Sequence, residues 1–183
     1  MMKKTEKLKK YIYYFFSFAF IGWIWEELEN IILHQRLINC GTLIGPWLPI
    51  YGWTMLIIIL LSKKIKNKPL LFLVIFLLCG IIEYSTSYFL EYFYHTRWWD
   101  YTNYPLNING RTSIEVLIVF SSLALLSKKY VVPFLDKIYE KINPKFLTIA
   151  LSIILLLHLM DFIYCINHPH KPEGIPISNL VSK

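Results

Sequence analysis

The sequence lacks the signature motifs of several common enzyme and binding classes. It contains no glycine-rich phosphate loop, so the chain does not bind ATP by that route. It contains no GxSxG pentapeptide, which leaves a serine hydrolase without its usual signature. Cys40, Cys79 and Cys165 have no CxxC spacing and are odd in number, so neither a disulfide framework nor a cysteine metal site is indicated. The patterns HLMD and HPH are too weak to predict a metal site, and no cofactor is expected.

Charged residues are also scarce. They make up 17% of the chain, against 56% hydrophobic residues and a mean hydropathy of +0.46. A soluble domain of this size cannot bury that much apolar surface, so the composition predicts a membrane protein. A net charge of +7 could indicate nucleic-acid binding. The lysines, however, cluster between apolar runs, which is the layout of cytoplasmic loops beside anionic lipid, so no nucleic-acid partner is expected.

Five apolar stretches predict an all-α integral membrane protein with five transmembrane helices. The expected spans cover residues 11–33, 45–62, 69–94, 111–127 and 146–166. The second is short for a bilayer. Residues 128–145 combine lysines with apolar residues at helical spacing, which predicts a cytoplasmic amphipathic helix on the membrane surface. We expect one helical domain over residues 1–166 and an irregular extracytoplasmic tail over residues 167–183.

The lysines predict the orientation of these spans. With the N-terminus in the cytoplasm, the clusters in residues 3–10, 63–68 and 128–145 all lie inside, and they hold most of the 19 basic residues. The same arrangement places all six tryptophans in the outer half of the protein. We therefore expect a multi-pass protein of the cell membrane whose C-terminus is extracytoplasmic.

Acidic residues from different spans share one depth in the predicted membrane. At a helical rise of about 1.5 Å per residue, Glu26, Glu83 and Asp161 lie about 20 Å from the inner ends of their spans. Glu115 lies near the outer end of its own span. A carboxylate that faces lipid costs about 2.5–3.5 kcal/mol on insertion scales. We therefore expect these faces to surround a polar pocket that opens to the outside.

Helical spacing predicts which side chains face this pocket. Glu83, Ser87 and Glu91 follow one another at four-residue intervals and share a face. Arg111, at the start of the fourth span, is expected to pair with Glu83, Glu91 or Glu115. One interpretation is a fully paired network that fixes helix packing. The other is a binding site, favoured because three acids beside one arginine leave negative charge for a ligand or a proton.

Three sequence blocks occur in order: GWIWE, GTLIGPWLPIYG, and EYSTSYFLEYFYHTRWWDY followed by NINGR. Together they resemble the bacterial family of polytopic membrane proteins called Putative ABC-transporter type IV. The resemblance implies a permease-like subunit and a cytoplasmic ATPase partner. The matching positions are Gly22, Trp23, Glu26, Gly41, Gly45, Pro46, Pro49, Tyr51, Gly52, Glu83, Glu91, Trp99, Asp100, Tyr101, Asn107, Gly110 and Arg111.

The residues and the resemblance predict a permease-like membrane subunit with an outward-facing pocket for a cationic or polar solute. Two alternatives stay open: an intramembrane enzyme that uses paired carboxylates on a lipid or isoprenoid, and a non-catalytic scaffold subunit. The candidate binding residues are Glu26, Tyr51, Glu83, Glu91, Trp99, Asp100, Asn107, Arg111 and Glu115. No catalytic residue is assigned. The expected partners are the lipid bilayer, an ATPase subunit and other subunits of a homo- or hetero-oligomer.

Overall fold

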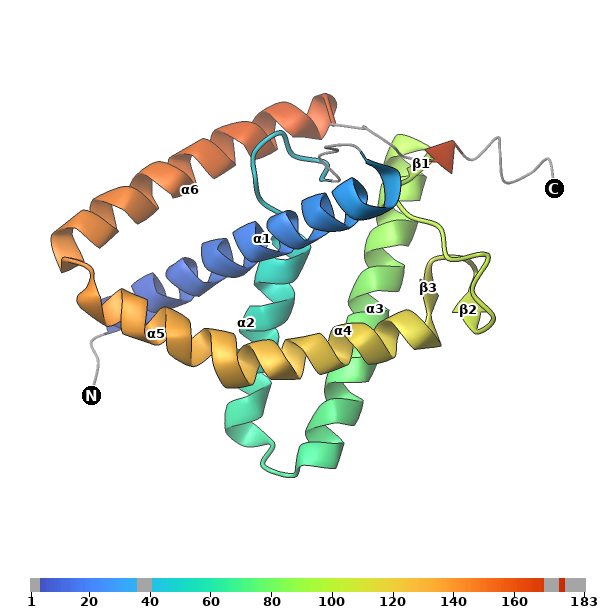
Figure 1. The fold of residues 1–183 in the computed structure, drawn as a ribbon. Coiled ribbons are helices and arrows are strands. Elements are labelled where there is room, and N and C mark those ends of the chain that lie inside the picture. Colours follow the sequence, from blue (N-terminus) through green and yellow to red (C-terminus); the bar gives the residue numbers. More distant parts are fainter. Residues whose placement is uncertain (1–3, 36–40, 170–174, 177–183) are drawn as a thin grey trace. The chain divides into compact units, whose positions relative to one another are not determined.

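The computed structural model describes residues 4–35, 41–169 and 175–176, and it is mostly helical, as the sequence predicts (Figure 1). The chain divides into two compact units. The first contains Met1–Ile57 and Ser127–His170, and the second contains Ile58–Leu126 and Lys171–Lys183. Each unit is described by itself below.

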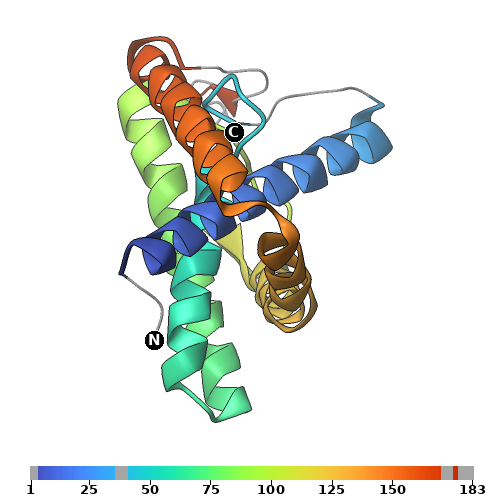
Figure 2. The same ribbon diagram turned by 90° about the vertical axis from the view of Figure 1, so that its left-hand side faces the viewer.

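The first unit is built from helices. They are α1 (Lys4–His34), the first part of α2 (Pro49–Lys64), the π-helical turn η1 (Ser127–Val131), α5 (Val132–Lys141) and α6 (Pro144–Asn167). The Asn143 side chain caps α6 by accepting a hydrogen bond from the Lys145 N–H at 2.9 Å. Pro144 occupies the first turn, where a helix needs no N–H donor. Helix α1 crosses α6, as Figure 2 shows.

The buried part of α1 is strongly aromatic, and it holds α5. The buried side chains of this part are Tyr13, Tyr14, Phe15, Phe16, Phe18 and Ala19. The Tyr13 hydroxyl donates to the Leu135 carbonyl at 3.2 Å. Asp136 accepts a hydrogen bond from Tyr14 and lies 2.5 Å from Lys10 Nζ. The Leu135 side of α5 is therefore buried against α1 within this unit.

The second unit consists of the rest of α2, two helices and short strands. The helices are α3 (Lys68–Tyr94) and α4 (Ile114–Leu126). The strands are β1 (Thr96–Arg97), β2 (Asn107–Ile108), β3 (Thr112–Ser113) and β4 (Ile175–Pro176). Strand β1 pairs antiparallel with β4, and β2 pairs antiparallel with β3. Helix α3 starts at the Asn67 cap, which accepts from the Leu70 N–H at 3.0 Å, and ends at His95, whose φ is 51°.

Helices α3 and α4 pack closely against each other. The buried residues of α3 recur every four positions: Leu71, Ile75, Cys79, Glu83 and Ser87. Those of α4 are Leu117, Ser121 and Ala124. Small side chains on this face let the two helices approach. The pattern continues along α3 to Glu91, which brings its carboxylate to the segment between the helices.

Three helices of the described residues are long and apolar enough to cross a membrane: Lys68–Tyr94, Ile114–Lys141 and Pro144–Asn167. The first and the third contain the expected third and fifth spans, whereas the second begins at Ile114, three residues after the expected start of the fourth span. The second of them continues without a loop through η1 into α5, where the sequence predicted a separate surface helix. Helix α2 has 16 residues, fewer than the about 20 that a bilayer requires. The five-span count and a surface position for residues 128–145 therefore stay predictions.

Candidate functional site

The segment between α3 and α4 is shaped by a tight hairpin. Asn109 and Gly110 join β2 to β3 with φ angles of 53° and 65°. Asn-Gly suits such a turn, because both residues must adopt positive φ. A Cβ atom at Gly110 would lie 2.6 Å from Asp100 Oδ1 and 2.5 Å from Thr102 Oγ1. The turn leaves no space for a side chain there, and it returns the chain to α3 at Arg111.

Two arginines share one carboxylate at the end of α3. Arg97 Nε lies 3.0 Å from Glu91 Oε2, and Arg111 Nη1 lies 2.5 Å from the same oxygen. Arg97 Nη1 lies 3.6 Å from Asp100 Oδ1 and donates to the Asn109 carbonyl at 3.3 Å. The arginine side chains are 9% and 11% exposed, and that of Glu91 is 14% exposed. The expected pairing of Arg111 with an acid of α3 is confirmed for Glu91.

The charge of this cluster is more balanced than the sequence suggested. Arg97 is buried and pairs with Glu91, so the expectation of one arginine beside three acids is wrong. Its position after the end of α3 hid this role, because its contact with Glu91 depends on how the chain folds after His95. Glu83 is buried and accepts a hydrogen bond from Thr112 Oγ1 at 2.5 Å. Among the ion-paired residues, Arg97 and Arg111 therefore match the charges of Glu91 and Asp100.

Three further candidates hold the segment in shape. The indole N–H of Trp99 donates to the Arg111 carbonyl at 2.8 Å. Asn107 Oδ1 accepts from the Gly110 N–H at 2.9 Å. Asp100 Oδ1 accepts from the backbone N–H of Thr102 at 3.0 Å. These residues position the arginines and do not line the cavity described below.

Glu115 lies at the start of α4, close to the same segment. Its Oε1 accepts from the Leu106 N–H at 3.3 Å. Its Oε2 is buried and has no hydrogen-bond partner among the described residues. The adjacent Ser113 caps α4, because its hydroxyl accepts from the Val116 N–H at 3.2 Å. Glu115 thus joins the start of α4 to the hairpin segment.

The other two candidates, Glu26 and Tyr51, lie in the first unit and contact each other. The Tyr51 hydroxyl donates to Glu26 Oε1 at 2.8 Å. Gly22, one helical turn before Glu26, lies directly against the Tyr51 ring, so a side chain there would collide with the ring. These three residues from two of the sequence blocks thus form one contact. A single pocket shared by all nine candidates stays a prediction.

Asp161, which the sequence placed in the shared layer of acids, binds the segment before α2. Its carboxylate accepts from the Ile44 N–H at 3.1 Å, the Gly45 N–H at 2.9 Å and the Trp47 indole N–H at 2.8 Å. Nearby, the Leu48 N–H donates to a carbonyl of α1 at 3.0 Å. The GPW part of the second sequence block is therefore anchored to α6 within the first unit.

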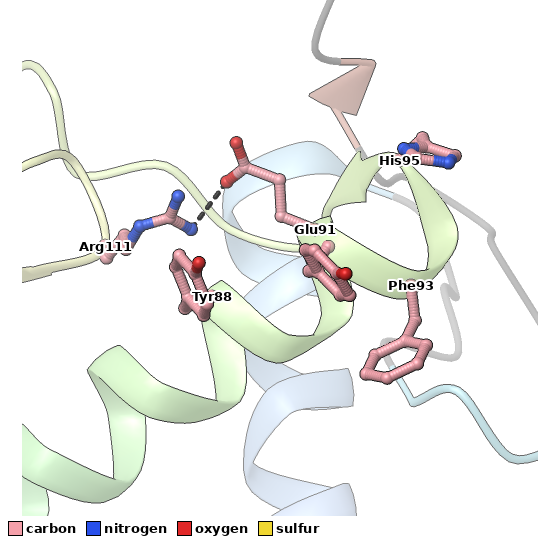
Figure 3. Close-up of a pocket in the computed structure, with 6 residues that line it drawn as sticks. Tyr88, Glu91, Phe93, His95 and Arg111 are labelled. Atoms are coloured by element: carbon pink, nitrogen blue, oxygen red, sulfur yellow. Dashed lines mark hydrogen bonds and ion pairs between the residues drawn. The ribbon is translucent and has the colours of Figure 1, made fainter.

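A cavity of about 540 Å³ lies beside the Glu91–Arg111 pair. Its lining residues are Tyr88, Glu91, Tyr92, Phe93, His95 and Arg111. In Figure 3 the Glu91 carboxylate and the Arg111 guanidinium point toward each other beside the Tyr88 ring, whereas Phe93 and His95 project away from this pair. Arg111 Cζ lies 5.3 Å from the centre of the Tyr88 ring and 5.7 Å from that of Tyr84, which is cation–π geometry.

Part of the hydrogen-bonding capacity of this pair is unused. Both arginines contact Glu91 Oε2, and neither contacts Oε1. Arg111 donates from Nη1 to Glu91 and, at 3.4 Å, to Ser87. Its Nε and Nη2 donate to no residue that the structure describes, although a guanidinium carries five donors. The two charged residues that line the cavity therefore keep an acceptor oxygen and guanidinium donors that make no hydrogen bond with the described residues.

Sequence reasoning missed Arg97, Tyr84, Tyr88 and His95 as parts of this site. The Asn-Gly pair was the signal that could have placed Arg111 and Arg97 on one carboxylate, since it predicts a hairpin. Tyr84 and Tyr88 are one helical turn apart, so the spacing that aligned Glu83 with Ser87 also aligns these rings. Within the described ranges, no group of three His, Cys, Asp or Glu side chains is placed to hold a metal ion.

Comparison with known proteins identifies one family. Residues 13–166 match the model of the family described as Putative ABC-transporter type IV. No curated protein and no solved structure matches the chain. The matched region contains all nine candidate residues.

Proposed function

Because the chain belongs to the Putative ABC-transporter type IV family, we propose that it is a permease-like membrane subunit whose cavity beside Glu91 and Arg111 binds a cationic or polar solute. One observation carries the binding proposal. Glu91 and Arg111 both line one cavity, and Glu91 Oε1 and the Arg111 donors Nε and Nη2 make no hydrogen bond to another described residue. A polar solute can add hydrogen bonds there without breaking the ion pairs that hold the site.

We propose five membrane spans with a cytoplasmic N-terminus and an extracytoplasmic C-terminus. Three apolar helices support the membrane location, and the clustered lysines support the orientation. In this arrangement the segment between α3 and α4, with its arginines, lies on the outer side. The cavity would then receive solute from outside the cell.

The chain has no phosphate loop, so transport driven by ATP requires a separate ATPase subunit. The cytoplasmic element proposed to meet it is α5, whose Leu135 side is buried against α1. Its opposite side exposes Phe134, which is 61% exposed, together with Lys137 and Lys141. An exposed aromatic residue beside lysines is a reasonable contact for a protein partner.

The test is to purify the tagged chain from membranes of its own host in mild detergent and to measure ATP hydrolysis in the eluate. We expect hydrolysis well above that of an unrelated tagged membrane protein. Glu91→Gln should keep the ATPase bound but change the rate of hydrolysis. Glu6→Gln, at an exposed surface pair with Lys9, serves as the matched control and should leave the rate unchanged. An eluate without hydrolysis above background would overturn the permease proposal.

A further inference from the structure

A second cavity of about 410 Å³ lies along α3 in the same unit. It is a mostly apolar groove between α3 and α4, and Leu77, Ile81 and Leu117 contribute to its lining. Gly80 also lines it and lets α4 pack closely against α3, because a Cβ atom there would lie 3.1 Å from a methyl group of Leu117. An apolar groove in a membrane-spanning helix pair fits a hydrocarbon chain.

The apolar groove lies next to the charged cavity. Tyr84 lines the groove, and its ring lies 5.7 Å from Arg111 Cζ, which lines the charged cavity. Thr112, the next residue after Arg111, lines the groove as well. From Leu77 to Glu91 the helix rises about 21 Å. The two cavities together thus extend along α3 for more than the about 15 Å that one lipid leaflet contributes to the hydrocarbon core.

We propose that the occupant of the two cavities is a lipid with a zwitterionic headgroup that carries a phosphate and a primary ammonium. Its hydrocarbon chain lies in the groove, its phosphate accepts hydrogen bonds from Arg111, and its ammonium donates to Glu91 Oε1. This proposal rests on the proposed binding site and names the class of its solute.

The charges of the site favour a zwitterion over either simple ion. A lone anion beside Arg111 would also face the carboxylate of Glu91, and a lone cation beside Glu91 would face both Arg111 and Arg97. A phosphate and an ammonium on one headgroup meet both residues with opposite charge. A quaternary ammonium has no N–H donor, so a choline headgroup loses the hydrogen bond to Glu91.

The test is native mass spectrometry of the detergent-purified full chain after removal of lipid. Phosphatidylethanolamine, phosphatidylcholine and phosphatidylglycerol with identical chains are added separately. We expect phosphatidylethanolamine to bind about tenfold more tightly than the other two, since a hydrogen bond to a charged group is involved. Glu91→Gln and Arg111→Lys should abolish this preference while the protein still binds lipid. Equal binding of the three lipids, or a preference that both variants keep, would overturn the proposal.

A pair of tryptophan substitutions tests the groove. Ile81 lines it and is 67% exposed, so Ile81→Trp fills the groove without disturbing the core. Phe89 is 58% exposed and lines neither cavity, so Phe89→Trp is the matched control. We expect a severalfold loss of phosphatidylethanolamine binding in Ile81→Trp alone. If both substitutions weaken binding equally, or if neither does, the hydrocarbon chain of the lipid does not lie in the groove.

Soluble phosphoethanolamine separates a lipid from a free headgroup. If phosphoethanolamine competes as strongly as the lipid, the hydrocarbon chain of the lipid contributes nothing to binding. The lipid proposal is then overturned in favour of a soluble zwitterion. The ATPase measurement on the same preparation keeps the two proposals apart. Hydrolysis without a lipid preference leaves the permease-like role standing and removes only the lipid.

Discussion

Arg111 Nη1 lies 2.5 Å from Glu91 Oε2, and this contact joins residues that are 20 positions apart in the chain. Glu91 belongs to the last turn of α3, whereas Arg111 directly precedes β3 and α4. Arg97 reaches the same oxygen from β1. One carboxylate thus connects the end of a helix, a strand and the hairpin, and Glu91 also lines the cavity beside them.

Glu91→Ala is expected to destabilise the protein strongly. The substitution leaves Arg111 without a carboxylate partner and leaves Arg97 with Asp100 alone. Removing one partner of a buried ion pair costs about 3–5 kcal/mol. The effect is measured as the midpoint of thermal unfolding in detergent, with the loss of monodisperse protein as the signal. Glu6→Ala, at a surface pair, should cost less than about 1 kcal/mol. Similar midpoints for the two variants would show that the cluster contributes little to stability.

Gly110→Ala is expected to cost more than Gly80→Ala. Gly110 has φ 65° and no space for a Cβ atom, so alanine there is both strained and crowded, at a cost above about 1 kcal/mol. Gly80 lies within α3, and its nearest neighbour is a movable methyl group of Leu117. Alanine also favours a helix over glycine by about 1 kcal/mol, which offsets the crowding. The same unfolding measurement compares the two alanine variants. An equal cost at both positions would show that the turn at Gly110 does not require glycine.

Asp161→Ala is expected to release the segment before α2. It removes the acceptor of the Gly45 N–H, the Ile44 N–H and the Trp47 indole. The Gly45 and Trp47 donors are partly buried, and a buried donor left without an acceptor costs about 1–3 kcal/mol. Asp161→Asn keeps one acceptor oxygen and should have an intermediate unfolding midpoint. Limited proteolysis should cut the alanine variant first within residues 41–48. Unchanged cleavage and stability would show that this carboxylate does not anchor the segment.

The long apolar helices were largely predictable from the sequence. The expected span of residues 69–94 corresponds to Lys68–Tyr94, and that of residues 146–166 to Pro144–Asn167. In both, an apolar run follows an Asn cap and a proline, so local chemistry sets the start. The sequence also predicted a break in the helix after Ser127, which the structure does not have. The lysines that marked it lie in a π-helical turn that continues the helix, because charged side chains do not by themselves end one.

The site was predictable only in part. The pairing of Arg111 with Glu91 was predicted correctly because periodicity places Glu91 on the polar face of α3, although Arg111 was expected in the next helix and instead directly precedes β3. Arg97 was missed because its direction depends on strand pairing and on the Asn109–Gly110 turn. Asp100 and Asn107 were expected to bind solute; both accept hydrogen bonds from backbone N–H groups, and their part in binding stays a prediction. Polar residues in a loop look alike in sequence whether they bind a ligand or fix the loop.

Cysteine labelling tests the proposed orientation at the two ends of α3. Lys66 precedes this helix and is expected inside, whereas Asn103 follows it and is expected outside. Each is replaced by cysteine in a background whose three native cysteines are serine. In intact cells a membrane-impermeant maleimide should label Asn103→Cys and not Lys66→Cys, because the lysines of residues 63–68 favour the cytoplasm. Permeabilised cells should label both, which shows that Lys66→Cys is reactive. Labelling of Lys66→Cys alone in intact cells reverses the orientation and moves the Glu91–Arg111 cavity to the cytoplasmic side. Labelling of both variants in intact cells means that α3 does not span the membrane.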